Sequence, residues 1–185
     1  MRKVIVFTNI SLDGFIAGPH DDITWVIADR ELHEAAIDLL KTADTVLYGR
    51  KTYQMMRDYW PTAPQNPSLP EYEVAFANVL NPLQKIVFST TLETTDWNTT
   101  IRRAFLPEEI EQLKQEEGKH IVLGGATIAQ QCMQHGLIDE IRLVVHPVVL
   151  GSGKPLFKDV STKLKLLQTE TLPSGAVRLY YQPAR

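Results

Sequence analysis

Two glycines stand at the end of a short apolar run, immediately before a segment with the composition of a helix. The run is residues 121–123, the glycines are Gly124 and Gly125, and the helix is expected to begin near Ala126. Glycines at the carboxyl end of a strand let a ligand approach the main chain, and the free N–H groups of a helix start favour an anion. This stretch therefore predicts a phosphate site. A tight turn without a ligand is the alternative, since the full G-x-G-x-x-G fingerprint is absent.

Three further strand ends carry residues that suit a phosphate or a ribose. They read Ser11-Leu12-Asp13-Gly14, Gly49-Arg50-Lys51-Thr52 and Ser89-Thr90-Thr91. Ligands of largely parallel sheets gather beyond the carboxyl ends of the strands. The cations of the second segment and the hydroxyl groups of the third would hold a 2′-phosphate, which favours NADPH over NADH. A solvated basic surface is the alternative interpretation of Arg50 and Lys51.

Other chemistries find little support in the residues. The histidines show neither H-x-x-x-H nor H-E-x-x-H spacing and the only cysteine is Cys132, so we expect no metal site. There is no G-x-S-x-G turn, and Gly153-Lys154 is followed by Pro155 rather than by the serine or threonine of a P-loop. Hydride transfer needs neither a metal nor a nucleophile, because the cofactor supplies the reactive group.

Length and composition restrict the class of protein. The chain has 185 residues, of which 44% are hydrophobic and 22% charged, which is typical of a single globular domain spanning residues 1–185. A net charge of -3 argues against binding to nucleic acid or to an anionic membrane. We find neither a signal peptide nor an apolar run of ~20 residues, so we expect a cytoplasmic protein without membrane contact.

Strands and helices are expected to alternate along the chain and to position the polar strand ends. Strands are predicted at 4–10, 45–48, 85–88, 100–103, 121–123 and 138–149, the last with a break near Pro147. Helices are predicted at 29–42, from 49 to about 60, and at 71–80, 107–118 and 126–136. Four prolines between Pro61 and Pro70 predict an irregular loop. Residues 163–172 and 176–182 should form a closing antiparallel hairpin. The fold class is therefore α/β with a mostly parallel sheet.

Four segments in this order resemble the dihydrofolate reductase-like superfamily. They read SLDGFIAG, then TVLYGRKTY followed by YWP, then KIVFSTTL, then IVLGGATIAQQCMQHGLIDEIRLVVHPVVLGSGKPLF. The similarity covers nearly the whole chain and is strongest to free-standing relatives of the reductase domain of the riboflavin biosynthesis protein RibD. It implies a three-layer α/β/α fold, with a C-terminal antiparallel hairpin on a mostly parallel central sheet, that binds NADPH across the strand ends.

The resemblance also implies roles for individual residues. Asp13 would lie near the reacting centre, and Ile16 and Ala17 would line the nicotinamide. The substrate wall would include Trp25, Tyr53 and Met56. The adenosine-side phosphates would contact Gly49, Arg50, Lys51 and Thr52, with Ser89 and Thr90 beside the 2′-phosphate. The pyrophosphate would contact Gly124, Gly125, Ala126, Thr127 and Ile128.

These inferences predict an NADPH-dependent reductase of a small heterocycle. The substrate would be a pyrimidine of the riboflavin pathway, as in 5-amino-6-(5-phosphoribosylamino)uracil reductase, or a pterin or dihydrofolate. Hydride would reach a C=N or C=O carbon, with the proton coming from water or from Asp13. The alternative is a non-catalytic module that binds or senses NADPH. Self-association as a homodimer, through a strand at 143–149, is a further expectation. The cofactor hypothesis requires Gly125 and Arg50 to line one groove.

Overall fold

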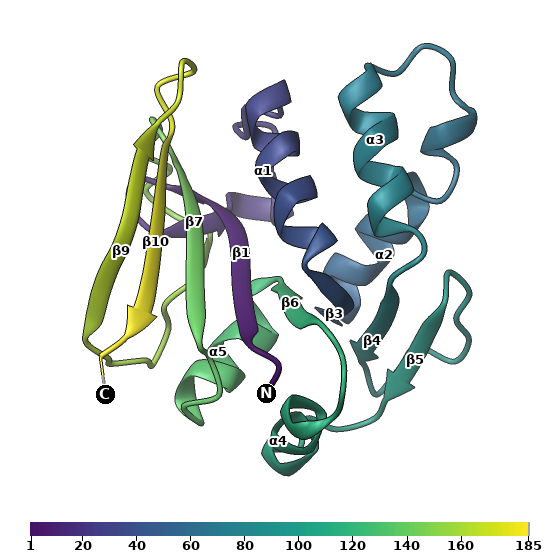
Figure 1. Ribbon diagram of the computed structural model, residues 1–185. Helices are drawn as coiled ribbons and strands as arrows, with labels where there is room; N and C mark the ends of the chain where they lie inside the picture. The colour runs from purple at the N-terminus through teal and green to yellow at the C-terminus, as the bar shows by residue number, and fades with distance from the viewer. Residues whose placement is uncertain (185) are drawn as a thin grey trace.

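The centre of the molecule is an eight-stranded sheet, shown in Figure 1 by a computed structural model that describes residues 1–184. In spatial order the strands are β5 (Thr99–Arg102), β4 (Gln84–Phe88), β3 (Ala43–Gly49), β6 (His120–Gly124), β1 (Val4–Ser11), β7 (Glu140–His146), β10 (Val177–Pro183) and β9 (Leu164–Thr171). Neighbours run parallel from β5 to β7, and β10 is antiparallel to both of its neighbours. The predicted mostly parallel sheet with a C-terminal antiparallel hairpin is confirmed.

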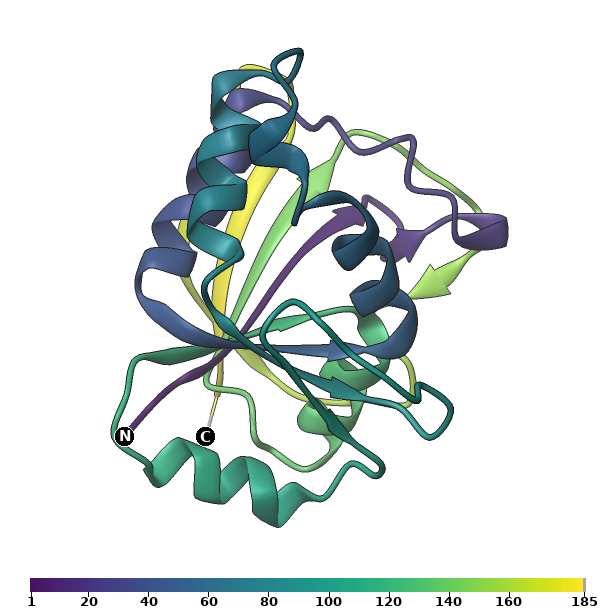
Figure 2. The same cartoon turned by 90° about the vertical axis from the view of Figure 1, so that its right-hand side faces the viewer.

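Helices cover both faces of this sheet (Figures 1 and 2). One face carries α1 (Arg30–Lys41), α2 (Arg50–Tyr59) and α3 (Glu71–Leu80), and the other carries α4 (Pro107–Gln115) and α5 (Ala126–Gln134). Successive side chains of a strand point to opposite faces, so Val4 and Val6 join the α5 core while Ile5 packs with α1. The expected three-layer α/β/α architecture is therefore present.

Local sequence signals explain where the first helix begins. The Asp29 carboxylate accepts a hydrogen bond from the Leu32 N–H at 2.9 Å, which makes Asp29 the predicted N-cap of α1. The buried positions of α1 recur at helical spacing and face the sheet and α3. The chain then returns through Thr42 into β3, which pairs with β6 rather than with β1. The strand that ends in the two glycines thus lies between the first two predicted strands.

One strand ends at its expected break, whereas one helix is shorter than expected. The strand expected at 138–149 with a break near Pro147 is β7, which ends at His146, and the helix expected to reach Gly118 is α4, which ends at Gln115. The proline-rich loop contains one 3-10 turn, η2 (Ala63–Gln65), because proline is tolerated in the first turn of a helix. Strand β7 pairs with β1 on one side and β10 on the other, so a dimer contact at 143–149 would not be formed by pairing of another strand with β7.

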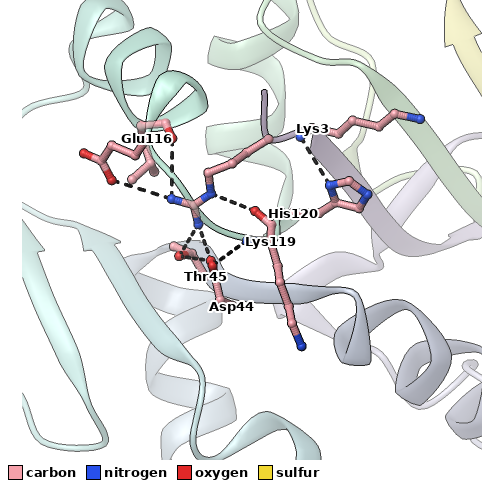
Figure 3. A network of polar contacts seen from close by, with 8 residues as sticks. Lys3, Asp44, Thr45, Glu116, Lys119 and His120 are labelled. Carbon is pink, nitrogen blue, oxygen red and sulfur yellow. Dashed lines mark hydrogen bonds and ion pairs between the residues drawn. The ribbon is translucent and has the colours of Figure 1, made fainter.

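A buried arginine, Arg2, ties the amino ends of three strands together, and Figure 3 labels its partners Asp44, Thr45 and Lys119. The Arg2 guanidinium donates to the Lys119 carbonyl oxygen at 2.7 Å and to the Thr45 hydroxyl at 2.7 Å, and it pairs with the Asp44 carboxylate. Asp44 in turn accepts from the Lys119 N–H at 2.7 Å. These contacts join the residues that precede β1, begin β3 and precede β6. They fix the end of the sheet at which these strands begin, which is opposite to their carboxyl ends.

Two negative findings apply to residues 1–184. None of the helices described there is long and apolar enough to cross a membrane. Within the same residues, no three histidine, cysteine or acidic side chains are grouped as a metal site would require.

Candidate functional site

Two cavities adjoin at the carboxyl ends of β3 and β6. The first, here called the polar groove, has a volume of about 1200 Å³ and runs past the starts of α2 and α5 to the end of β4. The second, here called the apolar cavity, has a volume of about 480 Å³ and lies between the sheet and helices α1 to α3. Thr52 and Gly125 line both cavities, so the two spaces meet at these residues. Arg50 and Gly125 line one groove, as the cofactor hypothesis requires.

Two helices begin at the polar groove without a side-chain cap. Gly49 is the N-cap of α2 and Gly125 is the N-cap of α5, and a glycine has no side chain to accept the first N–H groups. The residues of both first turns line the groove. Their N–H groups and the positive ends of both helix dipoles are therefore available to an anion.

Cations gather along the same groove. Arg50, Lys51, Arg103, Lys154 and Lys158 all line it. Among the described lining residues the one acid is Asp21, in the turn η1 (Pro19–Asp21). Its carboxylate lies 2.7 Å from the Lys51 Nζ, and this hydrogen bond and charge lower the pKa of Asp21. The excess of positive charge suits a ligand with more than one phosphate.

Arg103 is fixed beside the turn that follows β4. Its Nη1 donates to the Leu92 carbonyl oxygen at 2.6 Å and to the Ser89 carbonyl oxygen at 3.3 Å. The Ser89 hydroxyl oxygen accepts from the N–H groups of Thr91 and Leu92, so its proton remains free to donate. A guanidinium and a hydroxyl donor thus lie together at one end of the groove.

The two glycines are required by packing as well as by any ligand. A Cβ at Gly124 would lie 2.7 Å from the Tyr48 ring, and a Cβ at Gly125 would lie 2.5 Å from the Thr52 hydroxyl oxygen. Gly125 also has a φ of +93°, which side chains rarely adopt. The close contact of β6 with β3 and α2 therefore explains both residues, and the evidence for an anion comes from the helix starts and the cations.

The apolar cavity carries no formal charge from acids, lysines or arginines. Its described lining residues come mainly from β1, β3, β6, the loop before α1 and the three helices above the sheet, and none is Asp, Glu, Lys or Arg. Three apolar or aromatic residues at its mouth, Ile23, Met55 and Tyr59, are 42%, 47% and 43% exposed. A ligand that fills this space would lose its water to mostly hydrocarbon and ring surfaces.

Two polar side chains of the cavity wall are held by neighbours. The His33 Nδ1 lies 2.8 Å from the Asp29 carbonyl oxygen, and the His33 ring packs among Trp60, Tyr72 and Phe76. The Tyr59 hydroxyl donates to Glu73 at 2.6 Å, and this bond is the main reason that the pKa of Tyr59 is raised to about 12.

The structure brings most of the predicted cofactor residues to the polar groove. The groove is lined by Gly49, Arg50, Lys51, Thr52, Ser89, Thr90, Gly125, Ala126, Thr127 and Ile128. Gly124 lines the apolar cavity instead, as does Met56, which was predicted for the substrate wall. Ile16 and Ala17 lie in β2 (Phe15–Ala17), which pairs with β8 (Lys154–Pro155), and the neighbouring Gly18 lines the groove in their place.

Besides Ile16 and Ala17, three predicted site residues lie outside both cavities. Tyr53 is 2% exposed, and its hydroxyl donates to the Asp96 carbonyl oxygen at 3.1 Å within the core. The Trp25 indole N–H donates to the Asp22 carbonyl oxygen, and its ring packs edge-on against His146. Asp13 is on the turn between β1 and β2, away from the lining of either space.

The contacts of Asp13 fix two loops to each other. Its carboxylate accepts from the Ser11 hydroxyl at 2.7 Å, the Gly151 N–H at 2.7 Å and the Leu150 N–H at 3.1 Å. The bond from Ser11 comes first among the causes that lower the pKa of Asp13, followed by those from the two N–H groups. A carboxylate held in this way stays ionised at neutral pH, so these contacts fit a loop-fixing residue better than a proton donor.

Sequence reasoning missed several lining residues. Arg103, Lys154 and Lys158 of the groove belong to strand ends and turns whose spatial neighbours depend on the order of strands. The first of them stands in the visible pair Arg102-Arg103, which was a signal for an anion site. Asn9 of the apolar cavity was hidden inside a β-rich run, where alternation along the strand was the available clue.

The fold is that of a dihydrofolate reductase-like protein. The dihydrofolate reductase of Enterococcus faecalis, solved with NADP(H) and RAB-propyl, aligns over 99% of this chain and 97% of that one, with a TM-score of 0.65 at 12% identity. RibD of Acinetobacter baumannii aligns with a TM-score of 0.74 at 18% identity, over 100% of this chain and 58% of its own. At these identities the likeness concerns the fold.

The family follows from the sequence comparison. The model of the RibD C-terminal domain matches residues 2–178, so the chain belongs to that family. The chain is also 38% identical to the uncharacterized protein YyaP of Bacillus subtilis (strain 168). The alignment of 183 residues covers 97% of this chain and 94% of YyaP. The resemblance inferred from the four sequence segments is confirmed.

Proposed function

We propose that the protein is an NADPH-dependent reductase of a small heterocyclic compound. One observation carries the proposal: a long cationic groove and a separate apolar cavity share Thr52 and Gly125 at their junction. A dinucleotide is long enough to occupy such a groove and to present one end at the junction, while a substrate occupies the adjoining cavity. Membership of the RibD C-terminal domain family supports the same reading.

The residues of the groove fit the charges of NADPH. The uncapped starts of α2 and α5 would bind the phosphates of the central pyrophosphate. Arg103 and the Ser89 hydroxyl, with Arg50 nearby in the same lining, would bind the 2′-phosphate. This set of donors is the ground on which NADPH, rather than NADH, is proposed.

The chain itself contributes binding, orientation and the exclusion of water. When bound, NADPH supplies a hydride to a C=N or C=O carbon, and a proton from water completes the reduction to an amine or an alcohol. The apolar cavity would remove water from the substrate ring and hold it against the junction. Asp13 is not assigned the proton, because its carboxylate is held ionised between two loops.

The cofactor assignment is tested by charge removal in the groove. Arg50→Ala and Arg103→Ala should each weaken NADPH binding about tenfold to a hundredfold, because a charge-assisted hydrogen bond contributes roughly 1.5 to 3 kcal/mol. NADH lacks the 2′-phosphate and should be affected less than about threefold. Lys165→Ala, altered at an exposed position of β9, is the control matched for charge. Equal weakening of both dinucleotides would contradict the assignment.

A non-catalytic NADPH-binding module is the second candidate. It is favoured by the lining of the apolar cavity, in which the described residues include no carboxylic acid to donate a proton. Incubation with NADPH and a panel of pterins, dihydrofolate and aminopyrimidines separates the two. Loss of absorbance at ~340 nm with any member supports the reductase, and tight NADPH binding without that loss supports the module.

The remaining sequence predictions concern substrate, location and assembly. A pyrimidine of the riboflavin pathway and a pterin are both in the panel above. A cytoplasmic location is proposed from the family and the single cysteine. A homodimer is proposed as well, to be checked by light scattering.

A further inference from the structure

Asn9 is a polar side chain of β1 that lines the floor of the mostly apolar cavity. It lies in β1 two residues after Phe7, so both side chains point to the same face of the sheet and both line the cavity. Its Oδ1 lies 3.0 Å from the Nε2 of His146, at the end of the neighbouring strand β7. The orientation of this amide therefore depends on which nitrogen of His146 carries the proton.

The neighbours of His146 determine which of its ring nitrogens carries the proton. The Ile27 N–H is directed at the Nδ1 at 3.3 Å, so the Nδ1 must accept and cannot carry a proton of its own. His146 is 1% exposed, and burial is the main cause that lowers its pKa, against a weaker opposing effect of Asp29. A neutral imidazole that accepts at Nδ1 must donate from Nε2, so Asn9 accepts through Oδ1.

The amide nitrogen of Asn9 is thereby left for a ligand. Its Oδ1 is committed to His146, and no hydrogen bond within residues 1–184 uses its two N–H donors. An amide locked in this direction presents a donor to the cavity and disfavours another donor at the same point. The absence of acids, lysines and arginines from the described lining leaves no partner for a charged group on the ligand.

We propose that Asn9 selects an uncharged ring compound by donating a hydrogen bond from its amide nitrogen to a ring carbonyl oxygen, with His146 as the residue that holds the amide in this orientation. This inference rests on the proposed function to the extent that the apolar cavity holds the substrate. It goes further, because it names the acceptor that the substrate must carry. It also disfavours a substrate whose phosphate or carboxylate enters this cavity.

A matched pair of ligands tests the proposal on the unaltered protein. Pterin carries a ring carbonyl beside a ring N–H, and 2,4-diaminopteridine carries an amino group beside a ring nitrogen without a proton; the rest of the two molecules is the same. Binding is measured by quenching of ligand fluorescence without a dinucleotide, so the result does not depend on turnover. Pterin should bind at least about tenfold more tightly. Equal binding, a preference for the diamino compound, or no binding of either at about 1 mM would overturn the proposal.

Substitution should reverse the preference. Asn9→Asp replaces the donor by an acceptor while keeping an oxygen for His146, so 2,4-diaminopteridine should become the tighter ligand. Asn9→Leu removes the donor and should bring the two affinities within about threefold of each other. Asn66→Asp is the control, since Asn66 is exposed, lies outside both cavities and uses only its Oδ1, in a bond to the Ser68 N–H that aspartate preserves.

Two measurements test the role of His146: the protonation of its ring and the ligand selectivity of a His146 variant. Nitrogen NMR should show a neutral ring protonated at Nε2 at pH 7, and His146→Phe should lose the preference for pterin although the ring packing against Trp25 is kept. A ring protonated at Nδ1, or full selectivity in His146→Phe, would contradict the positioning role. Failure of the reductase proposal would appear separately, as weak NADPH binding or no loss of absorbance with intact pterin selectivity.

Discussion

Replacing Gly125 by alanine should destabilise the protein more than the same replacement at Gly14. The two glycines have nearly the same φ, +93° and +91°, a backbone conformation in which an alanine is strained at either position. That strain is about 1–2 kcal/mol for a left-handed residue with a Cβ. At Gly14 a Cβ would meet no atom within 4 Å, so strain should be the whole cost.

The additional cost at Gly125 comes from Thr52. The new Cβ would lie 2.5 Å from the Thr52 hydroxyl oxygen and 3.3 Å from the Thr52 Cβ, which the α2 backbone holds in place. Overpacking of this kind costs about 1–3 kcal/mol. We therefore expect a loss of about 2–5 kcal/mol for Gly125→Ala against about 1–2 kcal/mol for Gly14→Ala.

The assay is urea unfolding at pH 7, followed by tryptophan fluorescence and compared at constant m-value. In a Thr52→Ala background the hydroxyl and methyl groups are gone, so the cost of Gly125→Ala should fall toward that of Gly14→Ala. This coupling between neighbours is what a double-mutant cycle measures. Equal costs at the two glycines, or a cost at Gly125 that Thr52→Ala leaves unchanged, would refute the packing explanation.

Three further predictions concern buried polar groups. Cys132 is 0% exposed and burial raises its pKa to about 12, so a thiol reagent should label it at pH 8 only as urea unfolds the chain, and labelling of the folded protein would contradict this burial. Burial lowers the pKa of Lys85 from 10.5 to about 7, so between these pH values the unfolded state binds more protons than the folded state. The free energy of unfolding should therefore rise from pH 7 to 10. Urea titrations of Lys85→Met should show no such rise. Burial acts to raise the pKa of Asp44, but hydrogen bonds from Thr45 and Lys119 and the charge of Arg2 lower it, so its stabilising effect is lost as the pH falls below about 4. Arg2→Met should cost about 2 kcal/mol at pH 7 and flatten this acid dependence, as measured by thermal unfolding against pH.

Much of the architecture was predictable because local signals were strong. Short apolar runs ending in glycine or hydroxyl residues located the parallel strands, and Asp29 located the start of α1. The common edge of the parallel strands then placed Arg50 and Gly125 in one groove. Such inferences need only the spacing of apolar residues along each helix or strand and the parallel direction of the strands.

The failures have a different physical origin. Asp13 and Tyr53 carry the right chemistry in the right segments, but one side chain bonds to a loop more than 130 residues away and the other points into the core. The Trp25 ring packs against His146, and this contact depends on how the loop that carries Trp25 packs on the sheet. Long-range contacts of this kind have no counterpart in local sequence patterns, and the same limit hid the place of Lys154 and Lys158 in the groove.

Helix α2 serves both cavities along its length, since Arg50 and Lys51 line the groove while Met55, Met56 and Tyr59 line the cavity. A one-residue insertion between β3 and α2 would turn the helix by about 100° and displace both linings at once. Insertions in the proline-rich loop after α2 would leave the linings of both cavities intact. Directed evolution toward new substrates should therefore accumulate length changes downstream of Trp60 and only point substitutions upstream of it.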